Sequence, residues 1–232
     1  MRLLNTTTLE LEEIIGDRPA YAILSHRWQD DEVSFQDAIK GKASDRAGHS
    51  KIDMCCREAV KQGLKYVWID TCCIDKSSSA ELTEAINSMY QWYQDAEVCF
   101  VYLFDVDESE VGTQNTEEPG LQFSCSSWWT RGWTLQELIA PPTLEFYNST
   151  WSFLGSNHDL VDLTTTITGK HSKMLVGANP DSFSIAQRTS WASKRTTTRL
   201  EDVAYSLLGI FGNMPMLYGE GSELSLDCRK KS

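Results

Sequence analysis

Apolar runs and amphipathic stretches alternate along the first two thirds of the chain. Short apolar runs predict strands, and apolar residues at three- and four-residue spacing predict helices between them. The predicted strands are residues 20–25, 64–69, 98–103 and 144–147, and the predicted helices are residues 50–63, 80–95 and 128–139. This order predicts an α/β fold with a flavodoxin-like parallel sheet of about four or five strands, flanked by helices on both faces.

The pattern changes after residue 150. The strand signal fades, and helical periodicity returns only around residues 157–167 and 200–211. We therefore expect an α/β core over residues 1–150 and a C-terminal helical extension over residues 151–232. An acidic segment without periodicity, residues 105–127, is expected to form a long surface loop or a lid.

Composition narrows the classes of function. The chain has 232 residues, is 41% apolar and carries a formal charge of −12, so it can build a large core but its surface repels phosphate backbones. We expect no binding to nucleic acid. No run of about 18 apolar residues occurs, and the acidic N-terminal stretch does not resemble a signal peptide. These features predict a cytoplasmic protein without a membrane span.

Seven cysteines occur as two adjacent pairs and three single residues. Their apolar or strand-like surroundings indicate reduced, mostly buried thiols. Neither the vicinal cysteines nor the four scattered histidines have the spacing of zinc ligands, so we expect no metal.

Polar and aromatic side chains gather where predicted strands end. Ser25, Arg27 and Trp28 come at the end of the first strand, and Asp70 follows the second. Ligands of open parallel sheets bind beyond the carboxyl ends of the strands. We therefore expect one functional crevice, assembled from residues 25–31, 70–76 and 126–138.

The aromatic stretch before Pro141 contributes to the same crevice. Trp129, Trp133 and Glu137 follow at steps of four, which places them on one stripe of the predicted helix. Two interpretations remain open for each of the last two residues. Glu137 is either a surface glutamate or a catalytic carboxylate, and Trp133 is either a core residue or a stacking platform.

Two neighbouring features also leave alternatives open. His26 is expected to belong to a structural network around Asp70. The acids Asp70 and Asp75, together with Asp30 and Asp31, keep open a metal-binding pocket like that of a phospho-acceptor receiver.

Four separated motifs resemble the HET (heterokaryon incompatibility) domain of filamentous fungi. They are YAILSHRW (21–28), YVWIDTCCIDKSSSAELTEAINSMYQWYQDA (66–96), WTRGWTLQELIAP (129–141), and RTTTRLEDVAYSLLGIF (195–211) with MLYGEG (216–221). The resemblance covers most of the chain and implies a role in non-self recognition and programmed cell death. The family continues into another helix after YGEG, whereas this chain reads SELSLDCRKKS, so we expect that helix to be lost or altered.

HET domains are in turn remotely similar to TIR domains, some of which cleave NAD. These enzymes carry a W-x-x-x-E pattern on the helix after the third or fourth strand, and Trp133 to Glu137 matches that pattern. The resemblance makes Glu137 the catalytic candidate. It also implies substrate-binding roles for Ser25, Arg27, Trp28, Asp70 and Trp133, with NAD as substrate and no cofactor. Ser25 is not expected to be a nucleophile, because no G-x-S-x-G elbow surrounds it.

The function implied is that of an incompatibility effector that cleaves the N-glycosidic bond of NAD when its copies associate. An upstream receptor or a partner incompatibility protein is a further expected contact. One alternative is a non-enzymatic interaction module that relays a death signal. A third is a decayed copy with an altered C-terminus.

Overall fold

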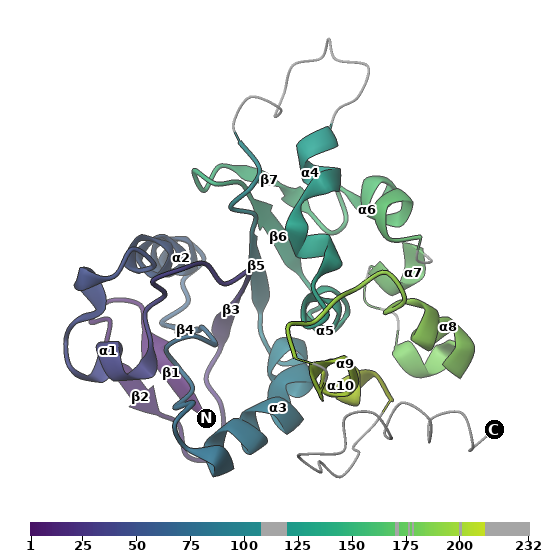
Figure 1. Ribbon diagram of the computed structural model, residues 1–232. Coiled ribbons are helices and arrows are strands. Elements are labelled where there is room, and N and C mark those ends of the chain that lie inside the picture. The colour runs from purple at the N-terminus through teal and green to yellow at the C-terminus, as the bar shows by residue number, and fades with distance from the viewer. Residues whose placement is uncertain (108–119, 170–171, 176, 178, 200, 212–232) are drawn as a thin grey trace.

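The computed structural model describes residues 1–107, 120–169, 172–175, 177, 179–199 and 201–211. Within these residues, seven strands form one sheet in the order β2-β1-β4-β3-β5-β6-β7 (Figure 1). Its four central strands are parallel: β4 (Tyr66–Trp68), β3 (Tyr21–His26), β5 (Val98–Tyr102) and β6 (Leu144–Tyr147). Numbered along the chain, these four have the order 2-1-3-4, which is the flavodoxin-like order. The predicted fold class is therefore confirmed.

The two edges of the sheet carry antiparallel strands that the sequence analysis did not predict. They are β1 (Arg2–Asn5) and β2 (Leu11–Glu13) beside β4, and β7 (Phe153–Ser156) beside β6. Each has only three or four residues, too few for the alternation that marks a strand in a sequence. Since β7 joins the same sheet as the core strands, the division of the chain at residue 150 stays a prediction.

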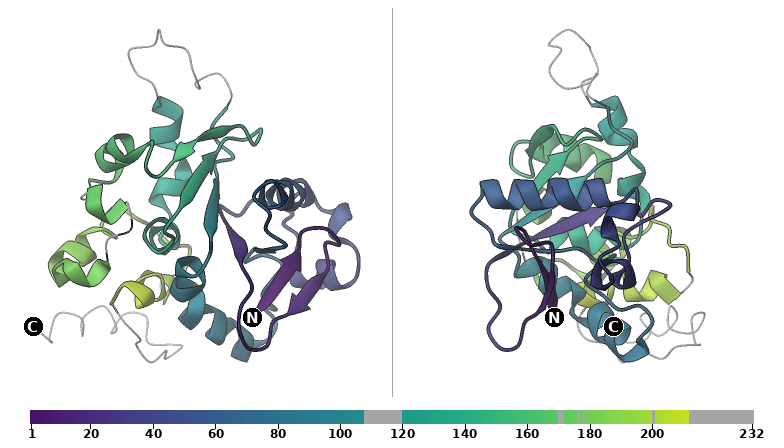
Figure 2. Two further views of the ribbon diagram at one scale, coloured as in Figure 1. Left: turned by 180° about the vertical axis from the view of Figure 1, so that it is seen from behind. Right: turned by 90° about the vertical axis from the view of Figure 1, so that its left-hand side faces the viewer.

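Helices cover both faces of the parallel strands (Figures 1 and 2). On one side, α2 (His49–Lys61) packs its buried Ile52, Cys55 and Ala59 over β3 and β4, preceded by α1 (Phe35–Ile39) and the 3-10 helix η1 (Ala43–Asp45). On the other side lie α3 (Ser79–Gln94) and α5 (Thr134–Ile139), which contact each other. These crossovers bury β3 completely, because every one of its side chains is covered.

The aromatic stretch before Pro141 does not form the single helix that its spacing predicts. A 3-10 helix, η3 (Ser127–Thr130), ends before Arg131, and α5 begins only at Thr134. The chain bends here because Gly132 donates its N–H to Thr196 O (2.8 Å), outside the helix, and Thr134 Oγ1 donates back to Trp128 O (2.6 Å). The predicted common stripe is therefore wrong. Trp129 lies in η3 and packs on Phe123 in the core. The bend separates it from Trp133, the residue before α5, and from Glu137 within α5.

The C-terminal part is helical, as predicted, but its helices are short. They are α6 (Val161–Thr168), α7 (Ser172–Leu175), the 3-10 helix η4 (Pro180–Ser182), α8 (Ile185–Ser190), α9 (Glu201–Tyr205) and α10 (Leu208–Phe211). They lie on the α3 and α5 side of the sheet, with α7 against α5 and α10 against α3 (Figure 1). The motif at 216–221 and the altered sequence after it lie outside the described residues.

The predicted long loop contains local structure where it is described. Residues 108–119 lie outside the described part, and α4 (Leu121–Cys125) and η3 follow. Six cysteines of the described residues are free thiols, and all except Cys125 are buried, as predicted; Cys228 lies outside. Among the described residues no helix has the length and apolar character needed to cross a membrane.

Candidate functional site

The candidate site lies where β3 and β5 end. These strands are neighbours in the sheet. After β3 the chain forms β4 on one side of it and then crosses to form β5 on the other side. Such a switch point leaves a crevice beyond the strand ends in open parallel sheets. Ser25 and His26 are the last residues of β3, Arg27 and Trp28 follow directly, and Asp70 lies two residues after β4. The predicted clustering of these residues at one edge therefore holds.

A buried hydrogen-bonded group joins β3 to α5 beneath this edge. Ser25 Oγ donates to Glu137 Oε2 and accepts from Trp128 Nε1 at 2.8 Å. Ser25 is fully covered and Glu137 is 7% exposed. The interpretation of Glu137 as a surface glutamate is therefore wrong. The carboxylate lies beneath the end of β3. It accepts a hydrogen bond from Ser25, a residue for which the family resemblance implies a substrate contact.

Burial changes the acidity of Glu137. Desolvation raises its pKa from 4.5 to about 7, and the negative charge of Asp70 acts in the same direction. The hydrogen bond from Ser25 and the positive charges of Arg131 and Arg195 oppose this rise. A carboxyl with a pKa near neutrality can exist in both protonation states at physiological pH, a property common in catalytic groups.

His26 lies beside this group as a buried, neutral imidazole. It is 4% exposed, and its Nε2 lies 3.9 Å from both Glu32 Oε1 and Asp70 Oδ1, too far for a hydrogen bond. Burial lowers the pKa of His26 well below its ordinary value, and the charges of Lys51, Arg131 and Lys76 act in the same direction. The imidazole thus fills space between two acids without being charged.

Trp28 lines the first of two clefts at this edge. It is 40% exposed, and its Nε1 donates to Asp70 Oδ2 at 2.8 Å, which fixes the indole at the crevice mouth. Lys76 Nζ lies 3.5 Å from the indole centroid and Arg131 Cζ lies 5.4 Å from it. Both distances are within the range of cation–π attraction.

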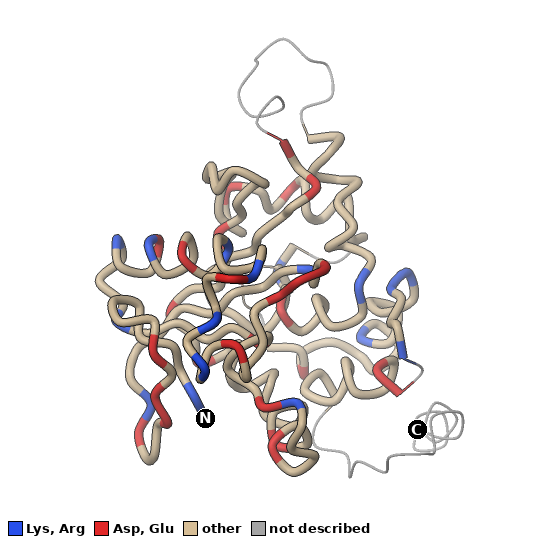
Figure 3. Tube along the Cα trace, turned by 60° about the vertical axis from the view of Figure 1, so that its left-hand side comes forward, with Lys and Arg blue, Asp and Glu red and all other residues tan. Residues whose placement is uncertain are grey.

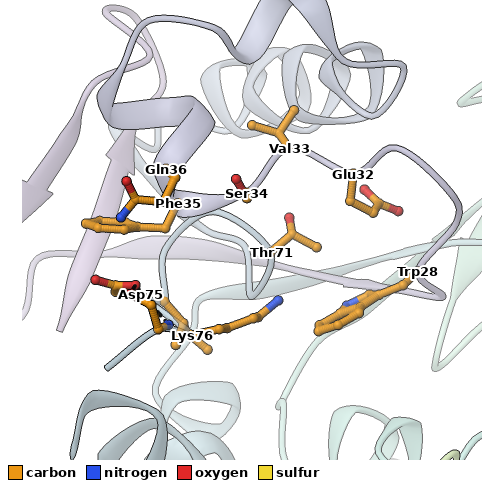
Figure 4. A pocket seen from close by; sticks show the side chains of 11 residues that line it. Trp28, Glu32, Val33, Ser34, Phe35, Gln36, Thr71, Asp75 and Lys76 are labelled. Atoms are coloured by element: carbon orange, nitrogen blue, oxygen red, sulfur yellow. Dashed lines mark hydrogen bonds between the residues drawn. The ribbon is translucent and has the colours of Figure 1, made fainter. Parts of the chain in front are cut away.

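The first cleft, here the Trp28 cleft, has a volume of about 190 Å³. Figure 4 shows Trp28 and Phe35 on opposite sides of it, with the Lys76 side chain extending between them toward the indole. Its remaining lining comes from Glu32, Val33, Ser34, Gln36, Thr71, Ile74, Asp75 and Ser77. An indole and a phenyl ring facing one small cleft suit a flat heteroaromatic ring.

The second cleft, here the Arg27 cleft, has a volume of about 130 Å³ and is polar. It is lined by Arg27, Thr130, Arg131, Trp133, Thr196, Thr197, Thr198 and Asp202. Trp133 is half-buried; it packs against the core and also lines this cleft, and its role as a stacking platform stays a prediction. Ser25, Asp70 and Glu137 line neither cleft, so the strand ends carry two clefts rather than the one crevice expected from the sequence.

Comparison with known proteins agrees with the motifs. Residues 21–121 match the family model described as "Heterokaryon incompatibility protein (HET)". Over 215 residues, 91% of this chain, the sequence is 45% identical to the vegetative incompatibility protein HET-E-1 of Podospora anserina. The chain belongs to the HET family. It spans 16% of the length of that relative, and no solved structure matches it.

Three acids of the receiver-like alternative each have a different partner in the HET domain. Asp31 pairs with Arg46 at 3.0 Å, Asp75 accepts from Ser77 Oγ at 2.6 Å, and Asp70 holds Trp28. In the part of the chain that the structure describes, no group of three or more His, Cys, Asp or Glu could hold a metal ion. Acidic and basic residues are interspersed along the chain trace (Figure 3).

Several residues around the HET-domain site were missed by sequence reasoning. Arg131 and Trp128 lie within the expected 126–138 segment but were given no role, and Thr196 and Thr197 come from the C-terminal part. Thr196 forms a parallel β-bridge with Arg131, an interaction between segments far apart in sequence. The RTTTR motif at 195–199 was the available signal, since several hydrogen-bonding side chains follow one another there.

Proposed function

We propose that this HET domain acts in heterokaryon incompatibility, and that its crevice cleaves the N-glycosidic bond of NAD when copies of the chain associate. The observation that carries the enzymatic part is the buried carboxylate of Glu137 beneath the end of β3, with a pKa raised to about 7. The similarity to a vegetative incompatibility protein of Podospora anserina supports the cellular role.

The chemistry requires one carboxylate rather than a glycosidase pair. Nicotinamide is bound to C1′ of the ribose as a cation, so it leaves with the bonding electrons as a neutral molecule and needs no general acid. Ionised Glu137 would stabilise the positive charge that develops at C1′. Water then adds to C1′, and the products are ADP-ribose, nicotinamide and a proton. A carboxylate in a dry, fixed position is most effective at such stabilisation.

Substrate contacts follow from the two clefts. Trp28 and the Trp28 cleft would receive one ring of the dinucleotide, and Arg27 would meet its diphosphate as a fork of donors. Asp70 would hold the Trp28 indole in place, and Trp133 would form a wall of the Arg27 cleft. Ser25 would give up its hydrogen bond to Glu137 in favour of a ribose hydroxyl.

Access to Glu137 supplies the reason for linking activity to association. With 7% of its surface exposed, the carboxyl can meet a ribose only after a segment packed around it moves. Contact between copies would favour the open arrangement if the open form binds the neighbouring copy better.

The proposal is tested by nicotinamide release from NAD, measured separately for monomeric and associated fractions of the purified chain. We expect release in the associated fraction, its loss in Glu137→Gln, and full retention in Glu84→Gln, which changes an exposed glutamate of α3. Equal release by wild type and Glu137→Gln would refute the catalytic role of this carboxyl.

A second function is favoured by the same burial. If Glu137 serves only to hold α5 against β3, the HET domain would relay a death signal as a non-enzymatic interaction module. Cell death that persists in Glu137→Gln at equal expression, without nicotinamide release by the wild type, would support this module. Loss of both killing and release would exclude it.

A further inference from the structure

The Arg27 cleft is lined by two arginines, Arg27 and Arg131. Within the part of the chain that the structure describes, neither Arg27 nor Arg131 has an acid within ion-pair distance. Arg27 Nη1 reaches only Ser127 O, at 3.5 Å, and Arg131 lies over the Trp28 ring. Other arginines of this acidic chain do form ion pairs: Arg2, Arg18, Arg46, Arg57 and Arg188. Two adjacent unneutralised guanidiniums are arranged for an external anion.

A strap, defined as residues 195–198, supplies the other wall of the cleft. Thr196 N donates to Thr130 O at 2.7 Å, and Arg195 Nη1 donates to Arg131 O at 2.7 Å. These bonds fix Thr196, Thr197 and Thr198 along the cleft beside the arginines. Arg195 adds a third positive charge near the cleft, and within the described part of the chain its Nη2 is buried without a hydrogen-bond partner.

One acid lines the cleft among the described residues. Among the described residues, Asp202, in the first turn of α9, has no side-chain hydrogen-bond partner, and its negative charge repels an anion. A carboxylate there is a suitable acceptor for a sugar hydroxyl next to a phosphate. The lining therefore combines cations, hydroxyl donors and one acceptor, which matches a phosphorylated sugar better than a simple anion.

We propose that the Arg27 cleft binds the diphosphate of a nucleotide, with Arg27 and Arg131 on the phosphates, the strap threonines beside them, and Asp202 on the adjoining ribose. The identity of the nucleotide as NAD or its ADP-ribose product rests on the proposed function. Arg131 then connects the two clefts, because it lines the diphosphate site and lies over Trp28, which lines the ring site.

Calorimetric titration of the whole chain at low ionic strength tests this site. ADP-ribose and inorganic pyrophosphate are expected to bind, and adenosine to bind about tenfold or more weakly. Arg27→Gln with Arg131→Gln should weaken both phosphate-containing probes by about tenfold or more. Asp202→Asn should tighten pyrophosphate binding, because it removes a negative charge, and should weaken ADP-ribose relative to pyrophosphate. Arg199→Gln, an exposed arginine outside the cleft, is the matched control and should change nothing.

The outcomes separate this inference from the proposed function. Arg-dependent ADP-ribose binding without nicotinamide release would leave the diphosphate site standing and refute NAD cleavage. Nicotinamide release with an unchanged KM in the double arginine variant would refute the diphosphate site and leave cleavage standing. Binding of pyrophosphate alone would overturn the nucleotide in favour of free inorganic diphosphate. Equal binding of adenosine and ADP-ribose would overturn the phosphate contacts.

Discussion

Replacing Glu137 by Gln should stabilise the HET domain at alkaline pH while removing its proposed activity. Burial raises the pKa of Glu137 from 4.5 to about 7, so the folded state prefers the protonated carboxyl. Ionisation of this group consequently disfavours folding as pH rises from about 4.5 to about 7. At about 1.36 kcal/mol for each pH unit, the full effect is about 3 kcal/mol. Glutamine is always neutral, and its side-chain oxygen can still accept the hydrogen bond of Ser25.

Urea unfolding followed by tryptophan fluorescence measures this effect. The free energy of unfolding of Glu137→Gln minus that of wild type should grow by about 2.5 kcal/mol between pH 5 and pH 8. A pH-independent cost of fitting the amide group shifts the whole difference but not its slope. Glu84→Gln should give a flat difference, because that residue is exposed. A flat difference for Glu137→Gln as well would refute the assignment of a raised pKa to this carboxyl.

Three further predictions follow from the contacts of the site. Asp70→Asn removes a charge that raises the pKa of Glu137, so nicotinamide release, which needs the ionised carboxylate, should reach half its maximal rate at a lower pH than in wild type; an unchanged pH profile would contradict this. Trp28→Leu removes the ring on which Lys76 lies and should raise KM for NAD about tenfold with a smaller change in kcat. The reason is that a stacking contact made equally in the ground state and the transition state contributes to substrate binding and not to the chemical step. A loss confined to kcat would argue against a stacking role. Gly132→Ala should loosen the strap and lower the free energy of unfolding by about 1–3 kcal/mol, because its new Cβ would meet Thr197 Cγ2 at 2.4 Å. Faster tryptic cleavage after Arg195 would report the loosening. Thr197→Ser should restore resistance, and failure of that rescue would exclude the clash as the cause.

The parallel core of the fold could be predicted because its signals are local. Residues 98–103 are an uninterrupted apolar run, and residues 80–95 repeat at helical spacing, so each reveals its element without knowledge of its neighbours. The edge strands could not be recognised in this way. In β1, Leu3 and Leu4 are consecutive and both buried, a pattern too short to distinguish a strand from any other buried segment.

The site was predictable only as far as strand ends determine it. Ser25, Arg27, Trp28 and Asp70 meet because parallel strands deliver their following residues to one edge. The expected stripe of tryptophans failed because Gly132 bonds to Thr196 instead of continuing a helix. Nothing in the local spacing of residues 128–139 encodes a partner from the C-terminal part of the chain, and the same long-range contact hid Arg131 and the threonines of the second cleft.

The strap also has a consequence for the order in which the molecule is made on the ribosome. Strands β3 to β6 and helix α5 are synthesised well before residues 195–198, and N-terminal units generally fold first during translation. A nascent chain can therefore complete its parallel strands while the turn at Arg131 still lacks Thr196 against it. Packing of the strap against this turn therefore follows synthesis of the sheet, so a ribosome stalled after β7 would hold the parallel strands without the strap in place.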